Sequence, residues 1–204
     1  LKLGTYDLGH FKSDKTNHPF LNAGFNFILV TKKDFLAAAK KGNKIANAQL
    51  ETYNLVDLPP NIVTPKYMAK WAQEAGEKYG FEVEVLGLEA SKIVKLGAFL
   101  AVGKGSANEP QFVIMNYTPK EEVPSMKHIG LVGKGITFDT GGLNIKTAAM
   151  VNMKCDMAGA GAVLGAMQLI ADLQLPVKVT AILPCAENAV DANSFLPSDV
   201  IHTY

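Results

Sequence analysis

The strongest constraint on the fold is the alternation of helix and strand patterns after residue 60. Thr64 followed by Pro65 is typical of a helix N-terminus, and Gly80 is typical of a helix end. Strand character is found in segments 81–87, 112–117, 128–132 and 177–183. Helical patterns are found at about 90–96 and at 157–173. This order predicts an α/β fold, a three-layer α/β/α arrangement with a mainly parallel or mixed central sheet.

The region before residue 60 has a simpler pattern. An aromatic and β-branched run at 25–30 predicts a strand. A long stretch of helix formers begins at Asp34, which is a suitable cap, and predicts a connecting helix over 34–54. Pro59 and Pro60 end any helix there, because proline lacks the amide donor and disfavours the helical region for the residue before it.

Charge and cysteine content exclude several classes of partner. Twenty basic residues against nineteen acidic ones leave a net charge of +1, so no broad basic field could hold a nucleic acid or an anionic membrane surface. The longest uncharged apolar run, 157–171, is shorter than the roughly 18 residues of a membrane span. Two cysteines are too few for a disulfide framework, so we expect buried thiols and a reducing compartment, with the cytoplasm preferred and an organelle left open.

The segment after the predicted strand 128–132 is the first candidate for chemistry, because open α/β sheets bind ligands beyond the carboxyl ends of their strands. It reads GKGITFDTGGLNIK, and we expect it to form a glycine-rich loop. The loop carries three charges, Lys134, Asp139 and Lys146, which are costly to bury without partners. This composition predicts a functional loop.

Nucleotide binding at this loop is disfavoured by spacing. The phosphate-binding pattern requires Gly-Lys followed by Ser or Thr, whereas here Gly135 follows Lys134. The later run MAGAGAVLG has dinucleotide-type glycines, but no apolar strand leads into it. Those glycines are better explained by close packing of a helix against the sheet.

A metal site is the other interpretation of these residues. Asp139 and Asp156 both lie where a loop meets a regular element, and carboxylate oxygens suit Mn, Mg or Zn. The four histidines show no ligand spacing. The alternative is that the two aspartates only cap turns or helices, and the residues alone leave both interpretations open.

A resemblance favours the metal interpretation. VGKGITFDTGGLNIK followed by MKCDMAGAGAVLGAM closely resembles the signature of the leucyl aminopeptidase (cytosol aminopeptidase) family of dinuclear metallopeptidases. The likeness extends through NLVDLPPNIVTP, LAVGKGSANEP and AILPCAENAVDANSFLPSDVI, so it covers about residues 34–204. It implies that residues 1–33 are the tail of an N-terminal domain and that 55–204 form the first part of an incomplete catalytic domain.

The resemblance also implies roles for individual residues. Lys134, Asp139 and Asp156 would be metal ligands, with Asp139 bridging two ions, and Lys134 would bind as the neutral amine because only that form has a lone pair. Lys146 would be the catalytic lysine, charged and in contact with the substrate carbonyl. Met153 would line the pocket for the first side chain of the substrate. The implied cofactors are two divalent metal ions, Mn or Zn with Mg as a third option.

Further implications concern the whole protein. The family acts on peptides with a free N-terminus, prefers leucine and other apolar residues, and usually forms hexamers. Its remaining ligands lie in an Asn-Thr-Asp-Ala-Glu-Gly-Arg segment that this sequence does not contain, so we expect the isolated fragment to be inactive. Two other functions stay open: a non-catalytic relative that serves as an oligomer-assembly module, and a nucleotide-binding α/β domain.

Overall fold

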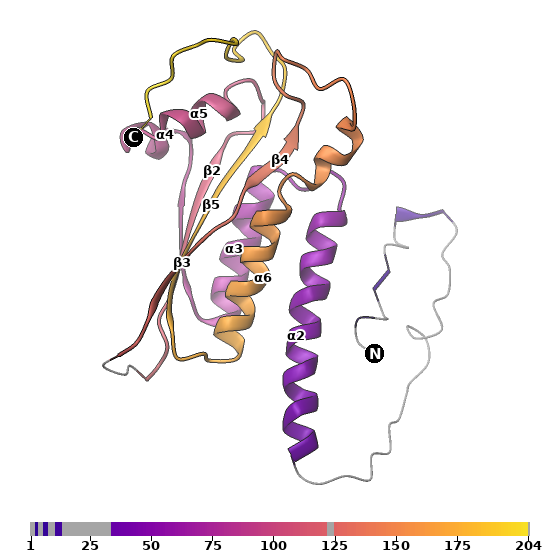
Figure 1. Ribbon diagram of the computed structural model, residues 1–204, viewed down its shortest axis with the longest axis vertical. Coiled ribbons are helices and arrows are strands. Elements are labelled where there is room, and N and C mark those ends of the chain that lie inside the picture. Colours follow the sequence, from indigo (N-terminus) through magenta and orange to yellow (C-terminus); the bar gives the residue numbers. More distant parts are fainter. Residues whose placement is uncertain (1–2, 4–5, 8–10, 14–33, 122–124, 204) are drawn as a thin grey trace.

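A computed structural model describes residues 3, 6–7, 11–13, 34–121 and 125–203 (Figure 1). The strand predicted at 25–30 and its flanks lie outside this part of the chain. The described helices are α2 (Asp34–Asp57), α3 (Pro65–Tyr79), α4 (Leu88–Ile93), α5 (Gly97–Gly103), the 3-10 helix η3 (Met150–Cys155) and α6 (Ala158–Asp172). The strands are β1 (Glu82–Leu86), β2 (Gln111–Tyr117), β3 (His128–Val132), β4 (Gly135–Asp139) and β5 (Lys178–Asn188).

The five strands form one mixed sheet centred on β5. Strand β5 pairs antiparallel with β2, which pairs antiparallel with β1. On its other side β5 pairs in parallel with β3 over its first half and with β4 over its second half. Strands β3 and β4 therefore follow one another along the same edge of β5, and β4 ends beside the carboxyl end of β5.

Helices cover both faces of the sheet, so the predicted α/β fold is confirmed. Alternate side chains of β2 point to opposite faces. Val113 and Met115 face α3 and α6 in the main core, whereas Phe112 faces the other way and packs edge to face against Phe99 of α5. Figure 1 shows α3 and α6 on one side of the sheet and α4 and α5 on the other. No helix of the described residues is long and apolar enough to cross a membrane.

Helix α3 forms as its sequence predicts. The Thr64 hydroxyl accepts a hydrogen bond from the Tyr67 amide at 3.2 Å, and Pro65 occupies the first turn. Gly80 ends the helix with φ 83°, a left-handed conformation that glycine adopts without strain.

Several details differ from the sequence prediction. The glycine-rich segment is not loop throughout, because residues 135–139 form β4. The short helix α5 was not predicted, since its sequence GAFLAVG has a glycine at each end, and β5 runs five residues beyond the apolar segment that predicts it. Cys185 is buried as expected, and burial raises the pKa of its thiol to about 12. Cys155 is only partly buried.

Candidate metal centre

The site begins at a break between β3 and β4. Gly133 still donates its amide hydrogen to the Ile182 carbonyl of β5, Lys134 lies between the two strands, and β4 resumes pairing with β5 at Gly135 in the same register. At the break the Lys134 carbonyl accepts a hydrogen bond from the Ala160 amide in the first turn of α6. The break therefore fixes the start of α6 against the edge of the sheet.

Two glycines make this close approach possible. A Cβ at Gly133 would lie 2.7 Å from the Ala160 Cα and the Gly159 carbonyl oxygen, both of them backbone atoms. A Cβ at Gly159 would lie 3.2 Å from the Lys134 amide nitrogen. Of the three glycines predicted to allow packing of a helix against the sheet, Gly159 has this role, whereas Gly161 and Gly165 pack against α2 instead.

Lys134 and Asp156 meet at this junction. Asp156 follows η3 immediately and precedes α6, and the Lys134 Nζ lies 2.9 Å from the Asp156 Oδ2. The Asp156 side chain is 19% exposed, whereas that of Lys134 is 59% exposed. The lysine thus reaches from the surface toward a carboxylate that is mostly buried.

Asp139 and Lys146 form a second pair at the end of β4. The Lys146 Nζ lies 2.8 Å from the Asp139 Oδ2. The other oxygen, Oδ1, accepts hydrogen bonds from the Gly141 amide at 3.0 Å and from the Asn188 side chain at 2.7 Å. The turn that brings Lys146 back is closed by its own amide, which donates to the Thr140 carbonyl.

The two pairs lie on neighbouring elements, because β4, which ends at Asp139, contacts η3, which directly precedes Asp156. Lys146 has a raised pKa, first because it donates a hydrogen bond to Asp139 and then because the charges of Asp139 and Asp156 act on it, while desolvation opposes the rise. Burial would raise the pKa of Asp139, but hydrogen bonds from Lys146, Gly141 and Asn188 outweigh it, and the pKa lies below its ordinary value. The charges of both carboxylates therefore contribute to the raised pKa of Lys146.

The donor set fits a divalent cation in part. Asp156 Oδ2 is buried and forms an ion pair with Lys134 at 2.9 Å, but no group among the described residues donates a hydrogen bond to it. A buried carboxylate oxygen without a hydrogen bond is suited to a cation ligand. Within residues 34–121 and 125–203 no group of three or more His, Cys, Asp or Glu side chains gathers at one point. The described site holds two carboxylates and two amines.

The remaining predicted residue and one unpredicted residue complete the description. Met153 lies in η3, where it is partly buried and its carbonyl accepts a hydrogen bond from the Asp156 amide. Asn188 was not predicted as a site residue, although it holds Asp139 and its carbonyl accepts hydrogen bonds from the amide and hydroxyl of Thr140. Its place at the carboxyl end of β5 is the signal that could have identified it.

Comparison with known proteins decides the family. Residues 51–204 match the family model described as the cytosol aminopeptidase family, catalytic domain. The chain belongs to the cytosol aminopeptidase family. The match includes the region of both Lys–Asp pairs, so the site lies within the catalytic domain of the family.

Solved structures of longer proteins resemble the chain. The bottromycin maturation enzyme BotP in complex with Mn superposes with a TM-score of 0.82 at 32% identity over 98% of this chain and 41% of BotP. Leucyl aminopeptidase from Trypanosoma cruzi gives a TM-score of 0.77 at 33% identity over 80% of this chain and 32% of that protein. Cytosol aminopeptidase from Coxiella burnetii gives 0.75 at 28% identity over 81% and 36%. The chain thus spans about two fifths or less of these relatives.

Proposed function

We propose that this chain contributes one half of a two-cation site to a metallo-aminopeptidase that removes the N-terminal residue, preferably leucine or another apolar residue, from peptides. The observation that supports the proposal is that the Lys134–Asp156 and Lys146–Asp139 ion pairs lie on neighbouring elements, since β4 contacts η3. Membership of the cytosol aminopeptidase family supports the reaction class, and the Mn complex of the related BotP supports a divalent cation.

The cation ligands would be Asp139, Asp156 and the neutral amine of Lys134, with Mn or Zn preferred and Mg as a third option. Two such cations, when bound, supply a water that ionises near neutral pH and polarise the peptide carbonyl. The buried Oδ2 of Asp156, which forms an ion pair but accepts no hydrogen bond within the described residues, supports this assignment. Lys134 reaches that oxygen from the surface, so its amine can approach a cation held by the same carboxylate.

Lys146 would act on the substrate directly. Its raised pKa keeps the ammonium charged at neutral pH, and its side chain is 34% exposed, so it can turn from Asp139 to a substrate oxygen. There it would donate a hydrogen bond to the developing oxyanion, a contact commonly worth about a hundredfold or more in rate. Met153 would line the pocket for the N-terminal side chain, which its apolar character and its place in the same turn as Asp156 support.

The same proposal covers the activity of the isolated chain and the location and assembly of the full-length protein. Among the described residues no group of three or more His, Cys, Asp or Glu side chains gathers at one point, which is few ligands for two cations, so we expect the 204-residue chain to be inactive by itself. The full-length protein would be a cytoplasmic hexamer acting on peptides with a free N-terminus. Light scattering after size-exclusion chromatography of that protein checks its assembly.

The activity test uses Leu-p-nitroanilide with a chain extended to the full catalytic domain of the family, in the presence of Mn or Zn. Lys146→Met should lower kcat about a hundredfold or more, and Asp139→Asn should abolish cation-dependent activity. Lys154→Met is the matched control, because Lys154 contacts Asp57 instead of the site. Full activity in both site variants would contradict the assignment of these residues.

A further inference from the structure

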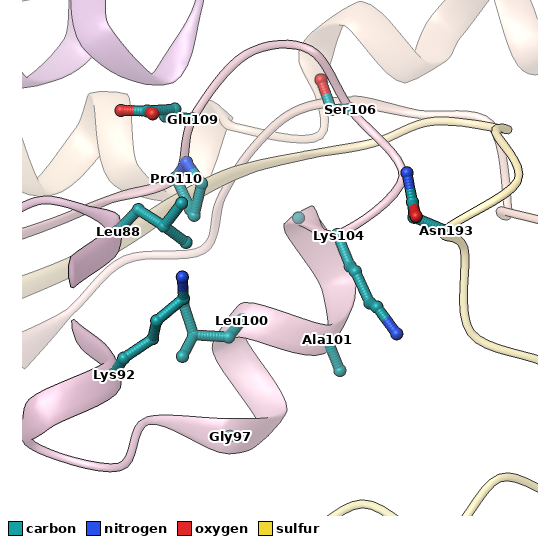
Figure 2. A pocket seen from close by; sticks show the side chains of 11 residues that line it. Leu88, Lys92, Gly97, Leu100, Ala101, Lys104, Ser106, Glu109, Pro110 and Asn193 are labelled. Atoms are coloured by element: carbon teal, nitrogen blue, oxygen red, sulfur yellow. The ribbon is translucent and has the colours of Figure 1, made fainter.

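A cavity lies outside the candidate metal centre. It has a volume of about 520 Å³ and is lined by α4, α5, the loop before β2 and one residue of the segment after β5 (Figure 2). None of the four charged residues of the metal centre lines it. Its volume lies in the range of small-molecule sites, which is about 300–1,000 Å³.

Part of the pocket lining is apolar and firmly supported. Leu88, Leu100 and Pro110 contribute apolar side chains, and Figure 2 shows the end of the Lys92 side chain between Leu88 and Leu100. The floor is fixed because Gly103 is buried against Pro110, where a Cβ would lie 3.2 Å from the proline ring, and against Ala186 of β5. This floor of the pocket therefore packs directly against the sheet.

The charged groups of the pocket differ in whether they already have partners. Lys92 forms an ion pair with Glu89 at 2.7 Å. Lys104 and Glu109 line the same pocket, and neither side chain has a hydrogen bond or ion pair with any residue that the structure describes. Lys104 and Glu109 thus line a single cavity as a cation and an anion without a side-chain partner among the described residues.

These two charges lie at different ends of the cavity. Figure 2 shows Glu109 on the side of Leu88 and Lys92, whereas Lys104 lies on the side of Asn193. The Asn193 side-chain amide has no hydrogen bond within the described residues and stands beside the lysine as a further donor. This end suits a carboxylate, and the Glu109 end suits an ammonium group.

The end that carries Asn193 is held in place by a turn. The Ser194 hydroxyl donates to the Ala189 carbonyl and accepts from the Asp191 amide at 3.0 Å. Gly105 packs under this turn, where a Cβ would lie 2.1 Å from the Ser194 hydroxyl oxygen. The turn and the loop after α5 therefore form one rigid rim.

We propose that this pocket binds a short zwitterionic peptide with apolar side chains, as a site separate from the metal centre. The ligand carboxylate lies on Lys104 and Asn193, its ammonium group faces Glu109, and its side chains pack against the apolar part of the lining. A neutral apolar molecule would leave both charges unused, and a simple anion would use only one of them. The opposite charges at the two ends also fix the direction of the peptide.

The test titrates Leu-Leu into the 204-residue chain by calorimetry in EDTA, which removes divalent cations from the metal centre. We expect saturable binding, with Gly-Gly at least about tenfold weaker because it lacks both apolar side chains. Leu-Leu amide and N-acetyl-Leu-Leu should each bind about three- to fivefold more weakly, the effect expected for exposed charge pairs. Equal binding of Leu-Leu and Gly-Gly, or no binding, would overturn the proposal.

Variants then test which group of the peptide binds at each end of the pocket. Lys104→Met should bind Leu-Leu and its amide equally well, and Glu109→Gln should bind Leu-Leu and its N-acetyl form equally well. Lys70→Met is the matched control, because Lys70 does not line this pocket and pairs with Glu74, and it should keep both discriminations. A Lys104→Met chain that still prefers the free carboxylate contradicts the proposed direction. Binding that is lost in Asp139→Asn but kept in Lys104→Met would place the peptide at the metal centre instead.

Discussion

At the scale of single residues, Asp139 shows how the fold prepares a carboxylate for chemistry. Its Oδ1 accepts from the Gly141 amide and from Asn188, and its Oδ2 lies 2.8 Å from the Lys146 Nζ. Three donors on one carboxylate offset the cost of removing it from water and fix its orientation. The donors at Oδ1 are tied to the backbone or to β5, whereas Lys146 is a long and movable side chain. Oδ2 is therefore the oxygen that can exchange its partner.

The pKa of Asp139 should respond to Asn188. Replacing Asn188 with Ala removes a hydrogen bond that stabilises the ionised carboxylate, so we expect the pKa of Asp139 to rise. Carbon-13 NMR titration of the Asp139 carboxyl group measures this shift. Asn61→Ala, at a residue with no hydrogen bond to Asp139, should leave the titration unchanged. An Asp139 pKa that is the same in Asn188→Ala and in the wild type would show that this hydrogen bond contributes nothing.

The Lys146–Asp139 pair also predicts a pH dependence of stability. The pKa of Asp139 lies below its ordinary 3.8, so its contribution is present above that value and is lost as the pH falls through the folded-state pKa. The pKa of Lys146 lies above its ordinary 10.5, so its contribution is present below that value and is lost as the pH rises through the folded-state pKa. Between these limits the pair stabilises the folded state.

Lys146→Met should accordingly lower the free energy of unfolding at pH 7, and the difference from the wild type should shrink in acid, as Asp139 becomes protonated, and in strong alkali, as Lys146 loses its proton. Urea denaturation at neutral, acid and alkaline pH measures it. Lys70→Met is a suitable comparison, because Lys70 is 71% exposed and lies 3.5 Å from Glu74 in an exposed helix pair, so its effect should be smaller at pH 7. A Lys146→Met effect that does not vary with pH would contradict a role of the ion pair in stability.

The charged residues of the site could be predicted from the sequence, whereas the residue that holds Asp139 in place could not. Lys134, Asp139 and Lys146 stand out because three charges in a glycine-rich segment need partners. Asn188 lies 49 residues after Asp139, and only the pairing of β4 with β5 brings the two together. No local pattern in the sequence encodes that contact.

At the scale of elements, the break between β3 and β4 is the feature that builds the site. Both strands pair with β5, and the break lets Lys134 leave the edge of the sheet beside the start of α6. The sequence did not show β4 as a strand, because ITFD is short and stands between glycines that are typical of a loop. Pairing with the long strand β5 outweighs this weak local preference.

Substitution at Gly133 should therefore disturb the junction. In Gly133→Ala the new Cβ would meet backbone atoms of Gly159 and Ala160 at 2.7 Å, so the start of α6 must move away from the sheet. We expect a loss of about 1–3 kcal/mol in the free energy of unfolding. Weaker binding of Mn in calorimetry should accompany it, because Lys134 and Asp156 separate.

Gly130→Ala is the matched control on β3. A Cβ at Gly130 would have no atom within 4 Å, and the substitution should leave both stability and Mn binding nearly unchanged. If the two variants behave alike, close packing at Gly133 is not what holds the start of α6.

At the scale of the whole molecule, α2 joins the sheet domain instead of standing apart from it. Ala48 and Leu55 are buried, and a Cβ at Gly165 of α6 would lie 2.2 Å from the Thr52 hydroxyl oxygen, so the two helices are in close contact. Lys44 adds a link, with its Nζ 2.9 Å from the Asp172 Oδ1. The helix extends three residues past the predicted end at 54, and the division into 1–33, 34–54 and 55–204 stays a prediction.

The two ends of α2 should differ sharply in their contribution to stability. Leu55→Ala removes a side chain that is 2% exposed in the main core, so we expect a loss of about 2–5 kcal/mol in the free energy of unfolding. Leu36→Ala, on the same helix but at a side chain that is 67% exposed, should change it by about 0.5 kcal/mol or less. Urea denaturation followed by circular dichroism compares the two variants. Equal small effects would mean that α2 does not fold together with the sheet, whereas a large effect confined to Leu55→Ala makes the last turns of α2 part of the domain that holds the candidate metal centre.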